Sequence, residues 1–302
     1  MALAGGAMHL LARLSMKPMP WSPAGETRFW RPVALRGAEL AFASYGRYAF
    51  PRHFHEEYLI ALMVGGVERL RHARGTDHVT AGSLILLDPG QVHENTAVDD
   101  NGFAYRTLFL PLRLAERCLI DAGFQATRLP GFGQAVVRDH EAFSVLLQLH
   151  LAVEAGEPAL RLQSLLVAGL SRIFRRHCAL PPPKQLLPPS PRRITQVREY
   201  LDAHFAENVS LDDLSRLAGL SAFHLARSFR ETVGLPPYRY QLHRRILYAL
   251  GRLREGAPIA STACEAGFAD QSHLNRHFKR ILGITPGQFR ADRKSVQDRR
   301  RR

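Results

Sequence analysis

Three histidines in the first third of the sequence have side chains suited to binding a metal ion or a small molecule. His53 and His55 are two positions apart, so on a β-strand their side chains would lie on one face. His93 follows the turn signal Pro89-Gly90. Imidazole nitrogens coordinate transition metals, and Glu57 could add a carboxylate to such a set. The same histidines could instead line a ligand pocket or simply end strands, and their spacing alone leaves these roles open.

The stretch from Gln271 to Leu282 combines an apolar stripe with a basic surface. At about 100° per residue on a helix, its large apolar side chains, Leu274 and Phe278 among them, cluster on one side, and Arg276 projects nearly opposite. A guanidinium can pair with a guanine edge, and lysine or arginine can contact phosphate. The pattern predicts a helix that packs one face on its own domain and presents the other to DNA.

A matching segment lies upstream, so the C-terminal part contains an internal repeat. LDDLSRLAGL (211–220) aligns with IASTACEAGF (259–268) at an offset of 48, and HLARSFRETVG (224–234) aligns with HLNRHFKRILG (273–283) at 49. Each copy reads as a short helix, a glycine turn and a second helix, which is the helix-turn-helix pattern. One such pattern also occurs in helix pairs that pack for stability alone, whereas two basic copies favour DNA binding.

Local residue preferences support the helix boundaries in both copies. Gly219 and Gly267 suit the turns, because glycine reaches conformations that a Cβ atom disfavours. Ser221 and Asp270 are good N-caps for the second helices. Gly234 stands where a glycine commonly ends a helix. These positions predict second helices that begin just after Ser221 and Asp270.

The first copy and the segment between the copies complete this arrangement. In the first copy Arg227 is predicted to take the place of Arg276. Its buried side is predicted to consist of Leu225, Phe229, Thr232 and Val233. One long helix is predicted over residues 236–256, and it would hold the two units rigidly apart. If their second helices lie about one DNA turn apart, roughly 34 Å, a single chain enters successive major grooves on one face of the DNA.

The charge distribution agrees with an anionic partner for the last third of the chain. Residues 190–302 hold 21 Lys and Arg against 11 Asp and Glu, and therefore +10 of the total net charge of +14. Such an asymmetry is typical of nucleic-acid binding, although a merely basic surface is the alternative. The 302 residues, 46% of them hydrophobic, are enough for about two domains with ordinary cores.

The composition changes along the chain and predicts an α+β protein. Short β-like runs separated by turns extend from about residue 28 to residue 112 and predict a small barrel or sandwich. Residues 134–178 have helical periodicity, interrupted near Gly156, which predicts an antiparallel helix pair. Six prolines between Leu180 and Pro191 predict a stiff linker. The predicted segments are an N-terminal extension (1–27), a β-barrel domain with the helical pair (28–179), the linker (180–191), an all-α domain with two helix-turn-helix units (192–293) and a basic tail (294–302).

Residues 194–293 resemble the DNA-binding domain of AraC/XylS-type bacterial transcription regulators. The resemblance rests on LDDLSRLAGLS, HLARSFRETVGLPPYRY, AGFADQSHLNRHFKR and GITPGQFR. It implies a seven-helix domain that binds double-stranded promoter DNA and acts with RNA polymerase, mostly as an activator. By position it implies DNA contacts from Phe223, Arg227, Gln271, Ser272, His273, Asn275 and Arg276. Lys279 and Arg280 lie farther along the second helix and are predicted to contact phosphate. Ala226 stands where the family often has a polar residue, so we do not assign base reading to it.

The N-terminal domain resembles the cupin-like effector domain of such regulators, through HFHEEY (53–58) and GSLILLDPGQVH (82–93). This resemblance implies a small-molecule effector, and we assign His53, His55 and His93 to its binding site, with no catalytic residue, metal or cofactor. Cupin enzymes hold a catalytic metal with similar histidines and a carboxylate such as Glu57. The alternative is therefore a metal-dependent cupin oxygenase or isomerase fused to a DNA-binding domain.

Compartment and assembly are predicted from the remaining features. Cys118, Cys178 and Cys264 are too far apart for a disulfide framework or a zinc site, which indicates reduced thiols in a cytoplasmic protein. No run approaches the roughly 18 apolar residues of a membrane span, so no membrane interaction is predicted. The helix pair carries more apolar surface than a hairpin needs. We therefore expect a homodimer, with Leu165 and Leu166 among its contacts.

Overall fold

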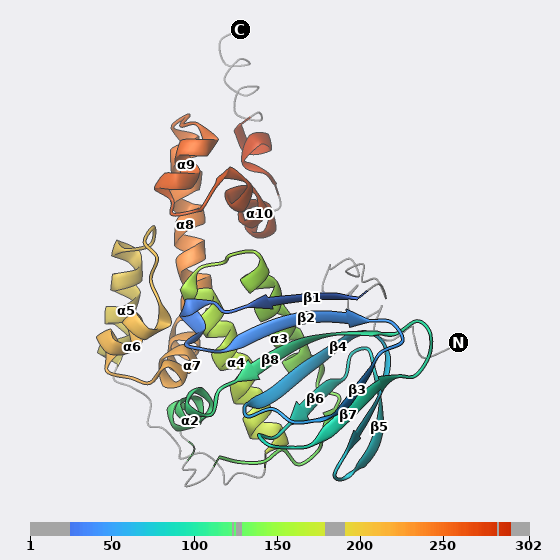
Figure 1. Ribbon diagram of the computed structural model, residues 1–302. Coiled ribbons are helices and arrows are strands. Elements are labelled where there is room, and N and C mark those ends of the chain that lie inside the picture. The colour runs from blue at the N-terminus through green and yellow to red at the C-terminus, as the bar shows by residue number, and fades with distance from the viewer. Residues whose placement is uncertain (1–24, 123, 125–128, 179–190, 283, 291–302) are drawn as a thin grey trace. The chain divides into compact units, whose positions relative to one another are not determined.

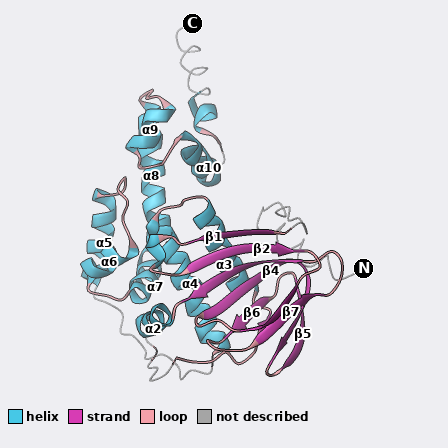
Figure 2. Cartoon of the chain, viewed as in Figure 1, coloured by secondary structure: helices cyan, strands magenta, loops and turns pink. Residues whose placement is uncertain are grey.

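The computed structural model describes residues 25–122, 124, 129–178, 191–282 and 284–290 (Figure 1). The chain divides into two compact units, residues 1–157 with 161–186 and residues 158–160 with 187–302. Strands occur in the first unit, whereas the described part of the second unit is helical (Figure 2). The predicted linker, apart from Pro191, and the predicted basic tail lie outside the described residues. Within those residues, no helix is both long and apolar enough to cross a membrane.

Most of the elements agree with the sequence pattern. The strands are β1 (Glu26–Trp30), β2 (Glu39–Tyr45), β3 (Ala49–His53), β4 (Tyr58–His72), β5 (Gly75–Thr80), β6 (Leu84–Leu87), β7 (His93–Ala97), β8 (Phe103–Leu110) and β9 (Val136–Val137). A short 3-10 helix, η1 (Val33–Leu35), precedes β2, and the α-helices of the first unit are α2 (Leu112–Asp121), α3 (His140–Glu154) and α4 (Ala159–His177). The predicted helix pair is thus α3 and α4. Helix α2 was not predicted.

The long strand β4 organises the sheet because it belongs to two sets of pairings. Its first half pairs with β6 and β8, and its second half pairs with β5 and β7. The register shifts between Met63 and Gly65, where the strand passes from one set to the other. Gly66 has φ +70°, and a Cβ atom built there would lie 2.0 Å from the carbonyl oxygen of Gly102. Only glycine therefore fits this crossing point.

The predicted barrel does not form, because the sheet is not closed. The main strand order is β1-β2-β8-β4-β6-β9, with β3, β5 and β7 attached beside β4. Among the described residues, β1 pairs with β2 alone and β9 pairs with β6 alone, so two edges stay unjoined. The sequence predicts individual strands from alternation and turns, whereas closure depends on pairing between strands far apart in the chain.

The two faces of the main sheet have different surroundings. Tyr105, Thr107 and Phe109 of β8 line a cavity. The alternate residue Arg106 is 1% exposed, and its guanidinium pairs with the carboxylate of Glu154 near the end of α3. Since successive side chains of a strand point to opposite faces, one face holds the cavity and the other receives the helices. Figure 1 shows α3 and α4 beside the sheet.

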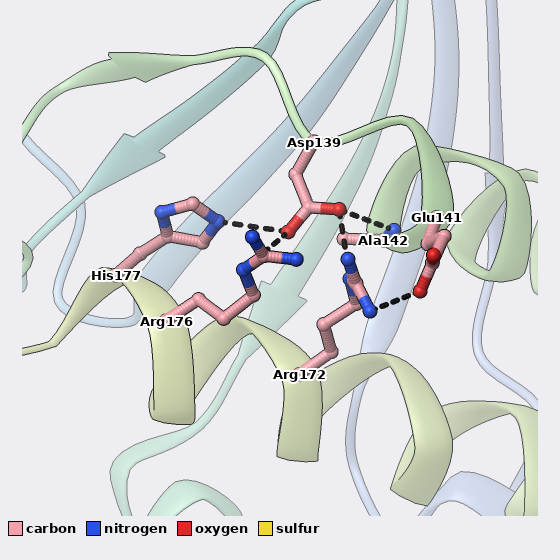
Figure 3. A network of polar contacts seen from close by, with 6 residues as sticks. All are labelled: Asp139, Glu141, Ala142, Arg172, Arg176 and His177. Atoms are coloured by element: carbon pink, nitrogen blue, oxygen red, sulfur yellow. Dashed lines mark hydrogen bonds and ion pairs between the residues drawn. The ribbon is translucent and has the colours of Figure 1, made fainter.

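A polar cluster joins the start of α3 to the end of α4 (Figure 3). Asp139 is the N-cap of α3, and its Oδ1 accepts hydrogen bonds from the backbone nitrogen of Ala142 at 3.1 Å and from Nε of Arg172 at 2.7 Å. Its Oδ2 accepts one from Nε2 of His177 at 3.1 Å, and Nε of Arg176 lies 3.7 Å away. One buried carboxylate therefore caps one helix and ties it to the last turn of the other.

The second unit contains α5 (Pro191–Ala203), α6 (Leu211–Ala218), α7 (Ala222–Val233), α8 (Pro237–Arg254), α9 (Ile259–Glu265) and α10 (Gln271–Leu282), and residues 286–290 are helical as well. The predicted caps are confirmed: Ser221 Oγ accepts from the backbone nitrogen of His224 at 3.2 Å, and Asp270 Oδ1 accepts from that of His273 at 2.6 Å. Gly219 and Gly234 adopt left-handed conformations at the ends of α6 and α7. The predicted helix between the two copies is α8.

Two of the four positions predicted to be buried in the first copy are not buried. Leu225 and Phe229 are buried, but Thr232 is exposed and Val233 is only half-buried. Ser228 is buried instead, at 5% exposure. A helical wheel places the apolar face correctly on average, but it cannot tell how far the neighbouring helix extends along that face.

A buried arginine of α8 joins the two helix-turn-helix units. Arg245 is 5% exposed, and its guanidinium donates to the carbonyl oxygens of Phe205 at 2.7 Å, Glu207 at 2.8 Å and Gly267 at 2.6 Å. Phe205 and Glu207 lie in the segment before α6 of the first copy, and Gly267 lies in the turn of the second copy. The charge is therefore satisfied by backbone carbonyls from both units, which holds the two turns at a defined separation.

Candidate functional site

The helix α10 presents the predicted DNA-facing residues away from its buried stripe. Leu274 and Phe278 are fully buried in a cluster with residues of α8 and α9. The predicted residues are exposed at Gln271, Ser272, Arg276, Lys279 and Arg280 and half-buried at His273 and Asn275. Five of the seven predicted side chains are therefore exposed and two are half-buried, so α10 has an accessible polar surface beside its buried stripe, as a recognition helix requires.

Arg276 and Arg280 of α10 differ in their side-chain partners. Among the described residues, no carboxylate pairs with its guanidinium. Nη2 of Arg280, in contrast, lies 2.8 Å from Nδ1 of the buried His277, a residue that the sequence did not single out. The ring of His277 stacks on Phe268 of the preceding turn. The guanidinium of Arg276 is thus available for a ligand outside the domain.

The corresponding helix α7 has a different charge pattern. Phe223 and Ala226 are half-buried, and Arg227 is exposed. Nε of Arg227 lies 2.9 Å from a carboxylate oxygen of Glu231, one helical turn further on. Glu231 occupies the place that Arg280 occupies in α10. Pairs this exposed contribute little to stability, so the ion pair can exchange for a phosphate or a base at small cost.

In the first unit, a mostly apolar cavity of about 200 Å³ lies against the sheet. Its polar lining consists of Thr27, Tyr45, His53, His55, His93, Asn95, Tyr105 and Thr107, and its apolar lining includes Phe50, Leu59, Leu70 and Phe109. The structure therefore brings the three predicted histidines to one cavity. A small concave apolar site with a few polar groups has the composition of a small-molecule pocket.

The three histidines meet because of the strand register. His53 at the end of β3 is the direct cross-strand partner of His93 at the start of β7, and their ring centroids are 4.2 Å apart. His55 follows β3, and its ring centroid lies 5.1 Å from that of His53 and 5.4 Å from that of His93. One ring nitrogen of each lies within 4.8 Å of the others. Glu57, the predicted carboxylate, is not part of this group.

Electrostatics favour the neutral ring at two of these histidines, His55 and His93. The pKa of His93 is lowered to about 4, mainly by burial; a hydrogen bond to the carbonyl of Gln91 opposes the shift, and the neighbouring rings of His53, His55 and His72 add to it. Burial likewise lowers the pKa of His55, with His53 adding to the shift and Glu57 opposing it. Neutral imidazoles carry the lone pair that a metal ion or a hydrogen-bond donor needs.

The sequence did not predict a buried carboxyl group beside this cavity. Glu68 of β4 is 0% exposed, and its Oε2 accepts a 3.4 Å hydrogen bond from the side-chain amide of Asn95, which lines the cavity. Burial raises the pKa of Glu68 to about 7, with the Asn95 hydrogen bond opposing the shift. Glu68 Oε1 and Asn95 Oδ1 lack partners among the described residues. The sequence feature that could have identified Glu68 is its position two residues before Leu70, because residues two apart in a strand lie on the same face.

Comparison with known proteins places these features in a family. Residues 37–170 match the model described as an AraC-like ligand binding domain, and residues 214–292 match a helix-turn-helix domain. An uncharacterized HTH-type transcriptional regulator of Bacillus subtilis (strain 168), YbfI, is 32% identical over 225 residues, which cover 74% of this chain and 81% of that protein. The chain belongs to the AraC/XylS family. This AraC/XylS regulator has a ligand-binding and a DNA-binding domain, as the sequence predicted.

Another curated relative and a solved structure are also similar to parts of this AraC/XylS regulator. The MmsAB operon regulatory protein of Pseudomonas aeruginosa is 26% identical over 244 residues, or 79% of this chain and 76% of that protein. A solved structure of an AraC-type transcriptional regulator from Chromobacterium violaceum is 28% identical, with a TM-score of 0.32, and covers 34% of this chain and 94% of that chain. The predicted α+β class is confirmed, with the cupin-like part as an open sheet.

Proposed function

We propose that this AraC/XylS regulator activates transcription from promoter DNA when a small molecule occupies the cavity of its first unit. The observation that carries the DNA-binding part is the position of Arg276. Its guanidinium is exposed, lies opposite the buried Leu274 and Phe278, and has no carboxylate partner among the described residues. Bidentate pairing of such an arginine with guanine is the commonest specific contact in the major groove.

The other DNA contacts follow from position along the two second helices. Arg227 breaks its ion pair with Glu231 and contacts DNA in the next major groove. Phe223 contributes an apolar contact there. Residues near the start of α10, Gln271, Ser272, His273 and Asn275, flank Arg276 at the base edges. Lys279 and Arg280 contact phosphate, because they lie farther along the helix. Arg245 supports this arrangement by holding the turn of the second copy to the first.

The effector site is the cavity that His53, His55 and His93 line. A volume of about 200 Å³ suits a small metabolite, and the apolar lining with clustered polar groups favours a molecule with both kinds of surface. Known relatives are transcription regulators, which favours a sensor over an enzyme. The activator role and the contact with RNA polymerase rest on family membership, and the cytoplasm is the compartment where promoter DNA is found.

A homodimer is also part of this proposal. The helices α3 and α4 supply the candidate surface, and Leu165 is half-buried on α4. Leu166, the other predicted contact, is 4% exposed, so this choice was wrong and Leu166 belongs to the interior. The prediction from helical periodicity failed there because an amphipathic wheel does not distinguish a core leucine from an interface leucine.

Selection of duplexes from a random pool with the full-length protein tests the function. Arg276→Ala should lose about 1–3 kcal/mol on the selected duplex and relax its preference at one base position. Arg254→Ala removes an exposed charge from α8 and is the matched control. A folded Arg276→Ala protein that keeps the full preference of the wild type would refute base reading by α10.

A further inference from the structure

The geometry points to a divalent transition-metal site formed by His53, His55 and His93 in the cavity of the first unit. Zn²⁺ and its first-row neighbours are the ions that imidazole ligands suit. The inference deepens the proposed effector site and rests on the proposed function for the role of that cavity. Metal binding itself is measured without DNA or effector, so the two proposals fail separately.

The first support is the convergence of three imidazoles from separate positions in the chain. His53 and His93 are brought together by the β3–β7 register, and His55 reaches them from the turn after β3. One nitrogen of each lies within 4.8 Å of the other two. Metal–nitrogen bonds of about 2.0–2.1 Å require the donor atoms to lie closer together than this limit, so the rings must rotate towards one another when an ion binds.

The second support is the hydrogen bonding behind two of the rings. Nδ1 of His53 lies 2.8 Å from the carbonyl oxygen of Pro51, and Nδ1 of His93 lies 3.0 Å from that of Gln91. A carbonyl oxygen only accepts, so each Nδ1 carries the proton and each Nε2 keeps its lone pair. Backbone carbonyls that hold histidines in this tautomer are typical of metal-ligating imidazoles.

A histidine that serves packing alone looks different in this protein. His150 of α3 is 1% exposed, it stands outside the histidine group, and neither of its ring nitrogens has a hydrogen-bond partner among the described residues. His53, His55 and His93 instead face a cavity that already has apolar walls from Phe50, Leu59 and Phe109. Apolar side chains would pack equally well against these walls, so packing alone does not explain the three polar rings in the lining.

Three protein ligands would leave at least one coordination position open. Within the described residues, no carboxylate completes the set, and the cavity of about 200 Å³ adjoins the rings. In three-ligand metal sites a water or a small molecule takes the remaining position. An oxygen-donor effector, such as a small carboxylate, could therefore bind to the ion directly, and the apolar walls would select its remainder.

Metal titration of the full-length protein tests the site. Chelator-treated protein is titrated with Zn²⁺ by calorimetry and with Co²⁺ by visible absorption, which reports nitrogen coordination directly. We expect one saturable site per chain, a Co²⁺ ligand-field band, and a melting temperature that rises with Zn²⁺ concentration. His53→Ala and His93→Ala should each lose the saturable site and the Co²⁺ band.

Two controls address other histidines. His78→Ala removes an exposed histidine of the neighbouring strand β5, and His273→Ala breaks the pair of histidines one turn apart on α10. Both variants should keep the Co²⁺ band. If an alanine variant fails to fold by circular dichroism, His93→Gln keeps a polar side chain of similar size without the imidazole and should still lose the band.

The outcomes separate the alternatives. Absence of saturable binding at micromolar Zn²⁺, unchanged binding in folded His53→Ala or His93→Gln, or loss of the band in His273→Ala would each overturn the metal site. Affinity for the selected duplex is measured in parallel on metal-free protein. Intact DNA preference without metal binding contradicts this inference alone, whereas a normal Co²⁺ band without DNA preference contradicts the proposed function alone.

Discussion

Arg245 donates a hydrogen bond from Nη1 to the carbonyl oxygen of Gly267, with the two atoms 2.6 Å apart. The same guanidinium binds the carbonyls of Phe205 and Glu207, so a side chain of α8 joins the segment before α6 to the turn before α10. The two DNA-binding copies are therefore linked through a buried charge as well as through the length of α8.

Loss of this link should weaken the whole second unit. Arg245→Ala leaves three carbonyl acceptors in a buried place without their donor, and we expect a loss of about 3 kcal/mol in the free energy of unfolding. Urea denaturation measures it. Arg254→Ala, on the exposed side of the same helix, should change stability by less than about 0.5 kcal/mol. Equal effects of the two substitutions would show that the buried hydrogen bonds are unimportant.

The two turn glycines should differ in their tolerance of alanine. Gly219 has φ +60° and open space around a built Cβ atom, so Gly219→Ala should cost about 1–2 kcal/mol through the left-handed conformation alone. At Gly267, with φ +78°, a Cβ atom would lie 2.2 Å from the carbonyl oxygen of Ala206. Gly267→Ala should therefore cost at least about 3 kcal/mol in urea denaturation. A smaller loss at Gly267 than at Gly219 contradicts the close packing of this turn.

The ion pair on α7 should lower DNA affinity. Glu231 carries a negative charge on the surface that we propose to face DNA, and its carboxylate lies 2.9 Å from Nε of Arg227. Glu231→Gln releases the arginine and removes the repulsion, so we expect tighter binding to all duplexes. Weaker binding by folded Glu231→Gln would mean that the carboxylate positions Arg227 for DNA.

Lys279→Ala should weaken binding to cognate and scrambled duplexes alike and reduce the salt dependence of the binding constant by about one unit of slope.

Asp139 should stabilise the helix pair at neutral pH. Burial alone would raise its pKa, but hydrogen bonds from Ala142, Arg172 and His177 outweigh burial and lower the pKa to about 2. A carboxylate whose folded pKa lies below its unfolded value of 3.8 contributes stability above pH 3.8, and loses it as the pH falls through about 2. Asp139→Asn should cost about 2 kcal/mol at pH 7 and progressively less towards pH 2.

The control for Asp139 is the exposed acidic partner of the same arginine. Glu141 also pairs with Arg172, but its side chain is 76% exposed. Glu141→Gln should therefore change the free energy of unfolding by less than about 1 kcal/mol at pH 7. If the two substitutions cost the same, the buried N-cap contacts of Asp139 contribute nothing beyond a surface pair.

Glu68 should have the opposite pH dependence. Its pKa in the folded protein is about 7, above the ordinary value of 4.5, because burial disfavours the charged form. The stability contributed by the neutral acid is present below pH 4.5 and is lost as the pH rises through about 7. Glu68→Gln should match the wild type near pH 4 and exceed its stability by up to about 3 kcal/mol at pH 8. Glu116→Gln, at an exposed site on α2, should show no such crossover.

The features that the sequence by itself determined are local. The N-caps Ser221 and Asp270 and the helix end at Gly234 were predicted because each depends on residues within about four positions. The repeat followed from the alignment of its two copies, and the strands and the pair α3–α4 followed from hydrophobic patterns that each element carries in its own residues. The basic face of α10 was predictable for the same reason, since helix geometry alone sets Arg276 opposite Leu274.

Tertiary structure decided what depends on partners distant in the chain. The open sheet, the burial of Glu68 and the exclusion of Glu57 from the histidine group result from strand register, which brings His53 beside His93 across 40 residues. The carbonyl ligands of Arg245 come from loops about 22 and 40 positions away. No local pattern predicts these contacts, because the free energy of a buried polar group depends on the groups that the fold places around it.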